Sequence, residues 1–249
     1  MNPHDASRKY LKELKGQPLK KKLEHIFTYY WIPIVIVLSL VFFLSWYITE
    51  QVTRKDSALF GYCINGAHVG ELDDPTVEKF ADKYIEFAGI DTKESEVTFI
   101  DNFFILYDQY DESTYNNIQS LFAHIAAEQV DFTVSGRDVF MGFAYSDTYM
   151  DLRTVLTPDQ YQKIEPILLY VDRAILDSED ESAIDNLIMN MDPADPSTMS
   201  DPIPVGIMIP EDSIFREYYS FTTTELVIGI IKNTQQLDNA LKLLEMILA

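Results

Sequence analysis

The feature that most constrains this chain is an uncharged, mostly apolar segment close to its N-terminus. No residue from Ile26 to Ile48 carries a formal charge, although 24% of the 249 residues are charged. A helix needs about 20 apolar residues to cross the roughly 30 Å hydrocarbon core of a bilayer. Tyr and Trp residues lie near both ends of the segment, as is typical of membrane interfaces. The sequence therefore predicts one transmembrane helix over residues 26–48, with a bend at Pro33.

A core helix, a signal peptide and a lipoprotein anchor each agree less well with this segment. A helix in the core of a soluble protein usually has a shorter apolar run. A signal peptide has an apolar region of about 7 to 15 residues followed by a small-x-small cleavage site, which the following "TEQVTRKDSALF" lacks. A lipoprotein carries its acylated cysteine directly after the apolar run, whereas Cys63 follows Ile48 only after a further stretch of chain. The segment is therefore predicted to be an uncleaved anchor.

The charges on the two sides of the segment predict its orientation. Residues 1–25 contain seven Lys and Arg and three Asp and Glu, a net charge of 7 − 3 = +4. From Ile26 onward, 19 − 7 = 12 basic and 40 − 3 = 37 acidic residues give 12 − 37 = −25. Because basic flanks stay in the cytoplasm, we expect a single-pass protein of the cell membrane. Its parts are a cytoplasmic segment over 1–25, the helix over 26–48, a linker over 49–57 and an extracellular domain over 58–249.

Charge and cysteine content exclude several properties of the outer domain. A net charge near −25 repels the phosphates of nucleic acids and of anionic lipids. Cationic peptides, divalent cations and neutral solutes remain admissible. Cys63 is the only cysteine, so the chain has no intramolecular disulfide, and its apolar neighbours predict a buried side chain. A domain of about 200 residues can bury a sufficient core without disulfides.

The outer domain alternates between strand-like and helix-like patterns. Strands are predicted at "SALFGYCI", "EVTFI", "FFILY", "VDFTVSG", "ILLYVDRAI", "PVGIMI" and "ELVIGII". Helices are predicted at "DDPTVEKFADKYIEFAG", capped by Asp74 and closed by Gly89, at "STYNNIQSLFAHIAAEQ", at "DESAIDNLIMN" and from Asn233 to the last residues. Such alternation is typical of an α/β domain with a mostly parallel sheet.

Part of this pattern resembles the extracellular solute-binding proteins of bacteria. The segment "LFAHIAAEQVDFTVSGRDVFMGFAYSDTYMDLRTVLTPDQ" and the closing "ELVIGIIKNTQQLDNALKLLEMIL" are similar to fold-level patterns of that family. The resemblance covers roughly residues 56–249 and is greatest to a shortened, membrane-anchored variety of Gram-positive bacteria. It implies a periplasmic-binding-protein-like fold, a small extracellular solute and an ABC-type permease as partner. The chain is too short for two full lobes, so one lobe must be reduced.

No motif of an enzyme or a cofactor site is present. The chain has no G-x-S-x-G, H-E-x-x-H, G-x-x-x-x-G-K-[ST], G-x-G-x-x-G or C-x-x-C sequence. His124 with Glu128, and His68 with nearby acids in "AHVGELDD", could each bind a cation, but packed or solvated side chains account for both better. The acidic loops "LDSEDES" and "MDPADPSTMSDP" offer oxygen ligands for calcium without EF-hand spacing, and we favour solvated surface loops. The sequence thus predicts neither an enzyme nor a metal site.

A ligand site is expected where the strands of an open α/β sheet end. The segments that leave three predicted strands carry the candidate ligand-binding residues Tyr107, Tyr110, Ser135, Arg137, Asp138 and Glu211. Arg137 can bind an anionic group with two hydrogen bonds. The alternative is a structural salt bridge from Arg137 to Asp138 or Asp151. Further aromatic residues could line a cleft: Phe140, Phe143, Tyr145, Tyr149 and Tyr170.

Two functions follow from these observations. The first is a membrane-tethered, solute-binding-like module that serves an ABC-type transporter or a sensing system, as the resemblance implies. The second is a non-catalytic accessory subunit of a membrane complex that has lost ligand binding. An aromatic-lined cleft would favour the first, and a filled cleft with an exposed apolar patch would favour the second.

Overall fold

A computed structural model describes residues 18, 20, 31–53, 55–70, 79–106 and 112–249. The chain divides into two compact units, Met1–Arg54 and Lys55–Ala249. In the first unit, helix α3 spans Trp31–Thr53. The second unit contains all of the strands that the structure describes.

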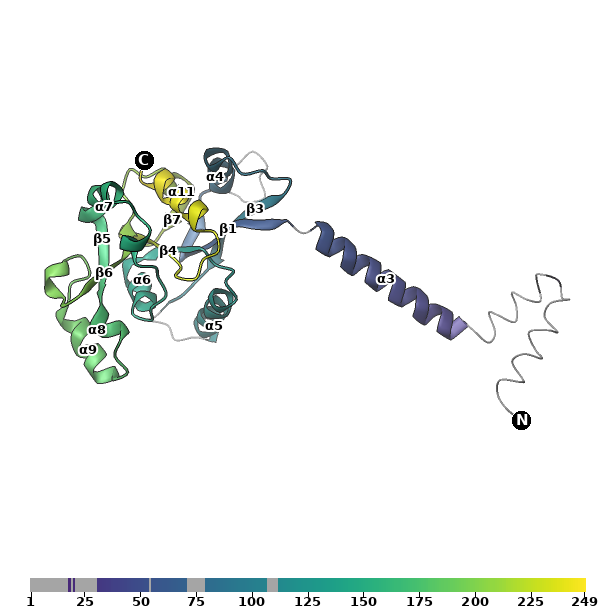
Figure 1. Cartoon of the computed structure of the whole chain (residues 1–249), viewed down its shortest axis with the longest axis horizontal. Helices are drawn as coiled ribbons and strands as arrows, with labels where there is room; N and C mark the ends of the chain where they lie inside the picture. The colour runs from purple at the N-terminus through teal and green to yellow at the C-terminus, as the bar shows by residue number, and fades with distance from the viewer. Residues whose placement is uncertain (1–17, 19, 21–30, 54, 71–78, 107–111) are drawn as a thin grey trace. The chain divides into compact units, whose positions relative to one another are not determined.

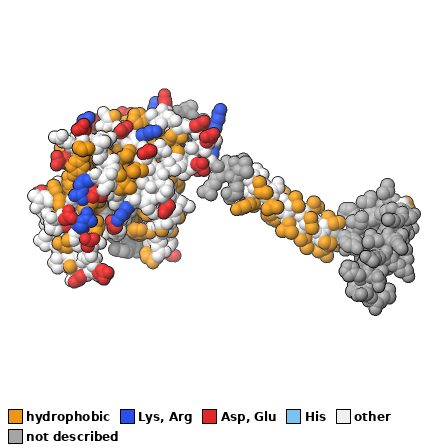
Figure 2. All heavy atoms as spheres, viewed as in Figure 1, with side chains coloured by type: hydrophobic (Ala, Val, Ile, Leu, Met, Phe, Trp, Pro, Cys, Tyr) orange, Lys and Arg blue, Asp and Glu red, His pale blue; other side chains and the backbone are white. Residues whose placement is uncertain are grey.

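Most of helix α3 is apolar on every side. Its candidate membrane-spanning part, Trp31–Thr49, contains no charged residue, and its large apolar side chains are exposed (Figure 2). At about 1.5 Å of rise per residue, this part is about as long as the hydrocarbon core is thick. The structure thus confirms an apolar helix that could serve as a membrane anchor or as a signal sequence. Residues 26–30 of the predicted span lie outside the described residues.

Six strands of the second unit form one mixed sheet. They are β1 (Asp56–Ile64), β3 (Ser95–Phe103), β4 (Phe132–Gly136), β5 (Leu168–Asp172), β6 (Pro202–Met208) and β8 (Leu226–Ile230). Their order is β3-β1-β4-β8-β6-β5. Two short strands, β2 (Gly66–His68) and β7 (Tyr219–Phe221), pair separately in an antiparallel sheet. The predicted α/β class is confirmed.

The prediction of a mostly parallel sheet is wrong. β1 runs parallel to β3 and β4, but β8 runs antiparallel to β4 and β6, and β5 runs antiparallel to β6. A parallel pair needs a connection that returns the chain to the opposite end of the sheet. Asp172 at the end of β5 instead lies beside Pro202 at the start of β6, so the helices between these strands bring the chain back to the same end.

Helices cover both faces of the sheet (Figure 1). One buried cluster packs the sheet against α4 (Phe80–Ala88), α10 (Phe215–Tyr218) and α11 (Leu237–Ile247), with α7 (Pro158–Ile164) at its border. The other packs it against α5 (Glu112–Ala126), α6 (Arg137–Ala144) and α8 (Arg173–Leu176), with α9 (Glu181–Asn190) at its border. The domain is therefore a helix-sheet-helix sandwich with one core on each face.

Strand alternation sends neighbouring residues into different cores. On β1, Leu59 and Cys63 belong to one buried cluster, and Tyr62 and Ile64 belong to the other. Cys63 is fully buried, which confirms its predicted place in the core. Burial, together with the negative charge of Asp101, raises the pKa of the Cys63 thiol well above its ordinary value, so this cysteine is poorly reactive.

Candidate functional site

The carboxyl ends of β1 and β4 border a small crevice. The chain passes from β1 to β3 on one side and then to β4 on the other side of β1. Open α/β sheets bind ligands where their connections diverge in this way. The crevice has a volume of about 180 Å³. Its lining comes from the ends of these strands, the first turn of α6, the end of β7 and the segment before β8: Asn65, Gly136, Arg137, Asp138, Val139, Phe221, Thr222, Thr223 and Glu225.

Acidic side chains already pair with Arg137 in this crevice. Its Nη2 lies 2.9 Å from Oδ1 of Asp192, and its Nη1 lies 4.0 Å from Oε2 of Glu225. Its backbone N–H also donates to the carbonyl oxygen of Glu225. The salt bridge therefore goes to acids other than the two considered from the sequence, and Asp151 pairs instead with Arg153 at 2.8 Å. A ligand carboxylate would have to compete with these partners.

Of the other described residues predicted to bind a ligand, one lies beside Arg137 in the crevice and two do not. Asp138 is exposed and lines the crevice. Ser135 is fully buried on β4, and its Oγ has no hydrogen-bond partner among the described residues. Glu211 is exposed in the segment after β6 and does not line the crevice. Tyr107 and Tyr110 lie outside the described residues.

The candidate aromatic residues pack mainly into the core. The rings of Phe140 and Tyr149 stack with centroids 4.2 Å apart, and both side chains are buried. Phe143 and Tyr170 are also buried, whereas Tyr145 is half-buried. None of them lines the crevice. These described residues therefore do not form the aromatic-lined cleft that a solute site would use.

The described residues contain no group of three or more His, Cys, Asp and Glu side chains that could hold a metal ion. His124 makes a hydrogen bond through Nδ1 to the hydroxyl of Tyr62 at 2.5 Å. The acids expected near His68 lie outside the described residues. His124 is thus hydrogen-bonded to the hydroxyl of Tyr62, a buried residue of the core.

Acidic side chains of the two loops serve as helix caps. Asp180 accepts hydrogen bonds from the backbone N–H and the hydroxyl of Ser182 at the start of α9. Asp195 accepts the same pair of bonds from Ser197 at the start of the short helix Pro196–Thr198. The hydroxyl bond is the largest cause that lowers the pKa of each carboxyl below its ordinary value. These carboxylates therefore act locally on helix termini.

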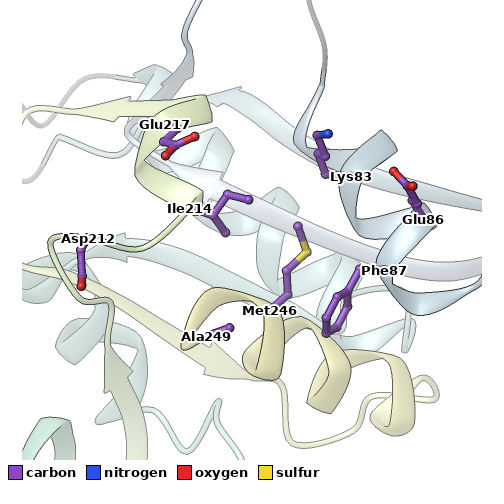
Figure 3. A pocket seen from close by; sticks show the side chains of 8 residues that line it. All are labelled: Lys83, Glu86, Phe87, Asp212, Ile214, Glu217, Met246 and Ala249. Carbon is purple, nitrogen blue, oxygen red and sulfur yellow. The ribbon is translucent and has the colours of Figure 1, made fainter.

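A larger groove lies between α4, α11 and the segment leading into α10 (Figure 3). It has a volume of about 550 Å³. Its apolar side chains are Phe87 on α4, Ile214 before α10, and Met246 on α11, and Ala249 adds to the lining. Phe87 is 51% exposed, which is high for a large aromatic side chain next to buried neighbours. This groove is larger than the crevice at Arg137.

Hydrogen bonds between distant segments fix the walls of the groove. The hydroxyl of Tyr84 on α4 donates to the carbonyl oxygen of Asn239 on α11 at 2.7 Å. The buried hydroxyl of Ser213 donates to the carbonyl oxygen of Ile247 at 2.6 Å, which satisfies a carbonyl in the last turn of α11. The groove is therefore formed before any ligand arrives.

Arg216 on α10 stabilises the wall formed by the segment leading into α10. Its guanidinium group donates to the carbonyl oxygens of Ile209, Pro210 and Thr224 at 2.7 to 2.8 Å. It thereby joins the segment after β6 to the segment before β8. Burial is the largest influence on this group and lowers its pKa. Arg216 therefore stabilises the wall and is not presented to a ligand.

The rim of the groove is mostly acidic. Three acids, Glu86, Asp212 and Glu217, line it together with one base, Lys83. All three acids are exposed, and Lys83 is half-buried. Apolar walls below an acidic rim suit a partner that has an apolar face flanked by positive charge.

The groove was not predicted from the sequence. Phe87 follows Phe80 by seven residues and Tyr84 by three, so helical periodicity places it at the edge of the apolar stripe and does not mark it as exposed. The other walls come from segments more than 100 residues away, and the sequence does not show that they meet. The expected cap at Asp74 lies outside the described residues, and α4 as described runs from Phe80 to Ala88.

Comparison of the chain with protein-family models, curated proteins and solved structures finds no match. The resemblance to solute-binding proteins therefore stays a prediction.

Proposed function

We propose that this protein is a membrane-anchored accessory subunit whose outer domain docks onto a partner protein. The observation that carries this proposal is the preformed apolar groove between α4 and α11. The crevice at Arg137 supports a solute site less well, because it is small and its guanidinium is already paired. A small crevice with a paired guanidinium together with an open apolar hollow favours an interaction domain over a solute site. The proposal includes no catalytic role.

Helix α3 is the anchor in this proposal. Its length and apolar surface suit a bilayer, and the basic residues before it favour a cytoplasmic N-terminus. The domain over 55–249 then lies outside the cell. Protease added to intact cells stripped of their wall should digest this domain. Protection of the domain combined with cleavage of the N-terminal segment would reverse the orientation.

Photocrosslinking in the membrane tests the docking function. The exchange Phe87→p-benzoylphenylalanine places a photoreactive group in the groove of the full-length chain. In the cells that naturally produce the protein, irradiation should give one discrete adduct with another membrane or extracytoplasmic protein. The same exchange at Met189, which is 83% exposed on α9, is the matched control and should give no such adduct.

A second substitution makes the result specific to the groove. Ile214→Asp places a charge in the apolar wall and should abolish the Phe87 adduct while the protein stays folded and membrane-bound. Absence of the adduct, or equal adducts from Phe87 and Met189, would refute docking through this groove.

A solute-binding module associated with an ABC-type permease is the second candidate. The observation in its favour is the position of Arg137 in a crevice at the ends of parallel strands. We would screen sugars, amino acids, oligopeptides and calcium by thermal shift of the full-length protein. A stabilising solute should lose its effect in Arg137→Ala and keep it in Arg153→Ala, whose ion pair with Asp151 lies outside the crevice. No stabilisation by any solute would exclude this candidate.

A further inference from the structure

The proposed docking function leaves the chemistry of the partner open. Resting on that function, we propose that the groove between α4 and α11 binds a cationic amphipathic helix of the partner protein. Three features support this inference: the apolar walls, the acidic rim and the absence of strand residues from the described lining.

The walls require an apolar face on the partner. Phe87, Ile214 and Met246 come from three different segments and converge on one hollow (Figure 3). The hollow of about 550 Å³ has room for more than one side chain of a partner. A helix presents such a face through residues spaced three and four apart.

The absence of a strand among the lining residues favours a helix over an extended peptide. The described lining residues belong to α4, α10, α11 and the segments next to them. An extended segment here would find no strand edge with which to pair its backbone, and unpaired backbone groups are costly to bury. A helix satisfies its backbone internally and buries only side chains.

The rim selects positive charge. Glu86, Asp212 and Glu217 outnumber Lys83, so the lining side chains have a net charge of 1 − 3 = −2. The residues from Lys55 onward strengthen the same preference, with 11 basic and 36 acidic side chains giving 11 − 36 = −25. Lysine or arginine residues beside the apolar face of the partner would lie opposite these acids.

The same charges disfavour two other occupants. A second copy of this domain would bring identical acidic rims together, and like charges at an interface are destabilising. An anionic lipid surface would be repelled for the same reason. The partner is therefore a different protein with a basic, apolar-faced helix.

Peptide binding to the full-length protein in phosphatidylcholine nanodiscs tests this inference. The probe is a synthetic helix of about five turns, roughly 18 residues, with leucines on one face and lysines on the other. Its matched control replaces every lysine with glutamate. At low salt the lysine peptide should bind about tenfold or more tightly than the glutamate peptide. The preference should shrink as salt screens the exposed rim.

Charge reversal on the rim should reverse this preference. In the double variant Glu86→Lys with Glu217→Lys, the glutamate peptide should bind more tightly than the lysine peptide. Glu245→Lys is the matched control, because Glu245 is exposed on α11 but does not line the groove. Ile214→Asp should weaken the binding of both peptides.

The outcomes separate this inference from the docking function. Equal or tighter binding of the glutamate peptide by the unchanged protein would refute the cationic partner and leave docking intact. A Phe87 adduct without binding of either peptide would refute the helical partner alone. A dimer that Ile214→Asp dissociates would replace the partner with a second copy. Failure of both the adduct and the peptides would refute both proposals.

Discussion

Two buried aspartates show how hydrogen bonds decide the protonation of an acid in this domain. Burial acts to raise the pKa of each, because a charged carboxylate loses hydration. Asp131 accepts hydrogen bonds from the backbone of Phe60 and the hydroxyl of Thr234, yet its pKa stays raised, with burial the largest cause. Burial is also the largest single influence on Asp172, but hydrogen bonds together lower its pKa. The donors to Asp172 are the backbone and hydroxyl of Ser200 and the backbones of Ala174 and Asp201.

Asp172→Asn should therefore change both stability and its pH dependence. The amide cannot accept all of these hydrogen bonds, so the free energy of unfolding at pH 7 should fall by about 1.5–3 kcal/mol. Because the folded pKa of Asp172 is lowered, its contribution is present above the ordinary value of 3.8 and is lost as pH falls through the folded pKa. Urea unfolding between pH 2 and 7 should show that this acid-induced loss is smaller in the variant.

Asp131→Asn is the control of opposite sign. The raised pKa of Asp131 means that its ionisation lowers stability as pH rises from 3.8 through the folded pKa. The asparagine variant should lack that decrease. Identical pH slopes in both variants and the unchanged protein would contradict the assignment of these shifts.

Among the secondary-structure elements, β1 determines much of the packing because it pairs with strands on both sides. Its Gly61 lies against the ring of Phe132 on β4. A Cβ atom at Gly61 would lie 2.3 Å from Cε1 of Phe132, which is too close for any side chain. The glycine in "LFGYCI" thus lets an aromatic ring pack over the strand backbone.

Gly61→Ala should destabilise the domain by about 1–3 kcal/mol, because the buried ring must move to relieve the overlap. The double variant Gly61→Ala with Phe132→Leu should recover part of this loss relative to the sum of the single variants. Chemical denaturation of the four proteins measures the coupling. If the losses in the free energy of unfolding of the two single variants simply add in the double variant, the alanine does not act through the ring of Phe132.

Local composition predicted β1, β4, β6 and β8 well. Each is a short apolar run bounded by polar residues, and such a run predicts a strand whichever neighbour it pairs with. The separate strand expected at "FFILY" is wrong. β3 ends at Phe103, where its partner β1 ends at Ile64. The side chain of Asn65 then binds the backbone of Ile105. A strand cannot continue once its neighbour has turned away, and composition does not report where the neighbour turns.

At the scale of the whole molecule, the sequence predicted the class of the fold but not the direction of its strands. Helical periodicity indicates that a helix is present. It does not indicate at which end of the sheet the next strand begins, and this decides whether the two strands are parallel. The partners of Arg137 in the candidate site could not be predicted for a related reason. Arg137 and Asp192 pair across 55 residues, and the sequence does not show this contact. Phe87 has the helical spacing of the core residues Phe80 and Tyr84, so the sequence did not show that its side chain is exposed.

The compactness of the unit Lys55–Ala249 predicts that it folds without the anchor. A fragment over residues 55–249 should be soluble and monomeric, because its two cores are complete among its described residues. It should need no reductant, since its single cysteine is buried. Size-exclusion chromatography with light scattering, with and without reductant, measures this. Aggregation of every preparation would show that folding depends on the membrane helix or on a partner.

The central claim is that the groove between α4 and α11 is a partner-binding surface outside the cell, and cysteine labelling in intact cells tests it most directly. Because Cys63 is buried, Phe87→Cys and Met189→Cys each introduce one accessible thiol. A membrane-impermeant maleimide should label both variants fully in the purified protein. In intact cells we predict full labelling of Met189→Cys and strong protection of Phe87→Cys, with Ile214→Asp removing that protection. Equal labelling of both positions in cells would contradict the claim, and no labelling of either would contradict the outward orientation.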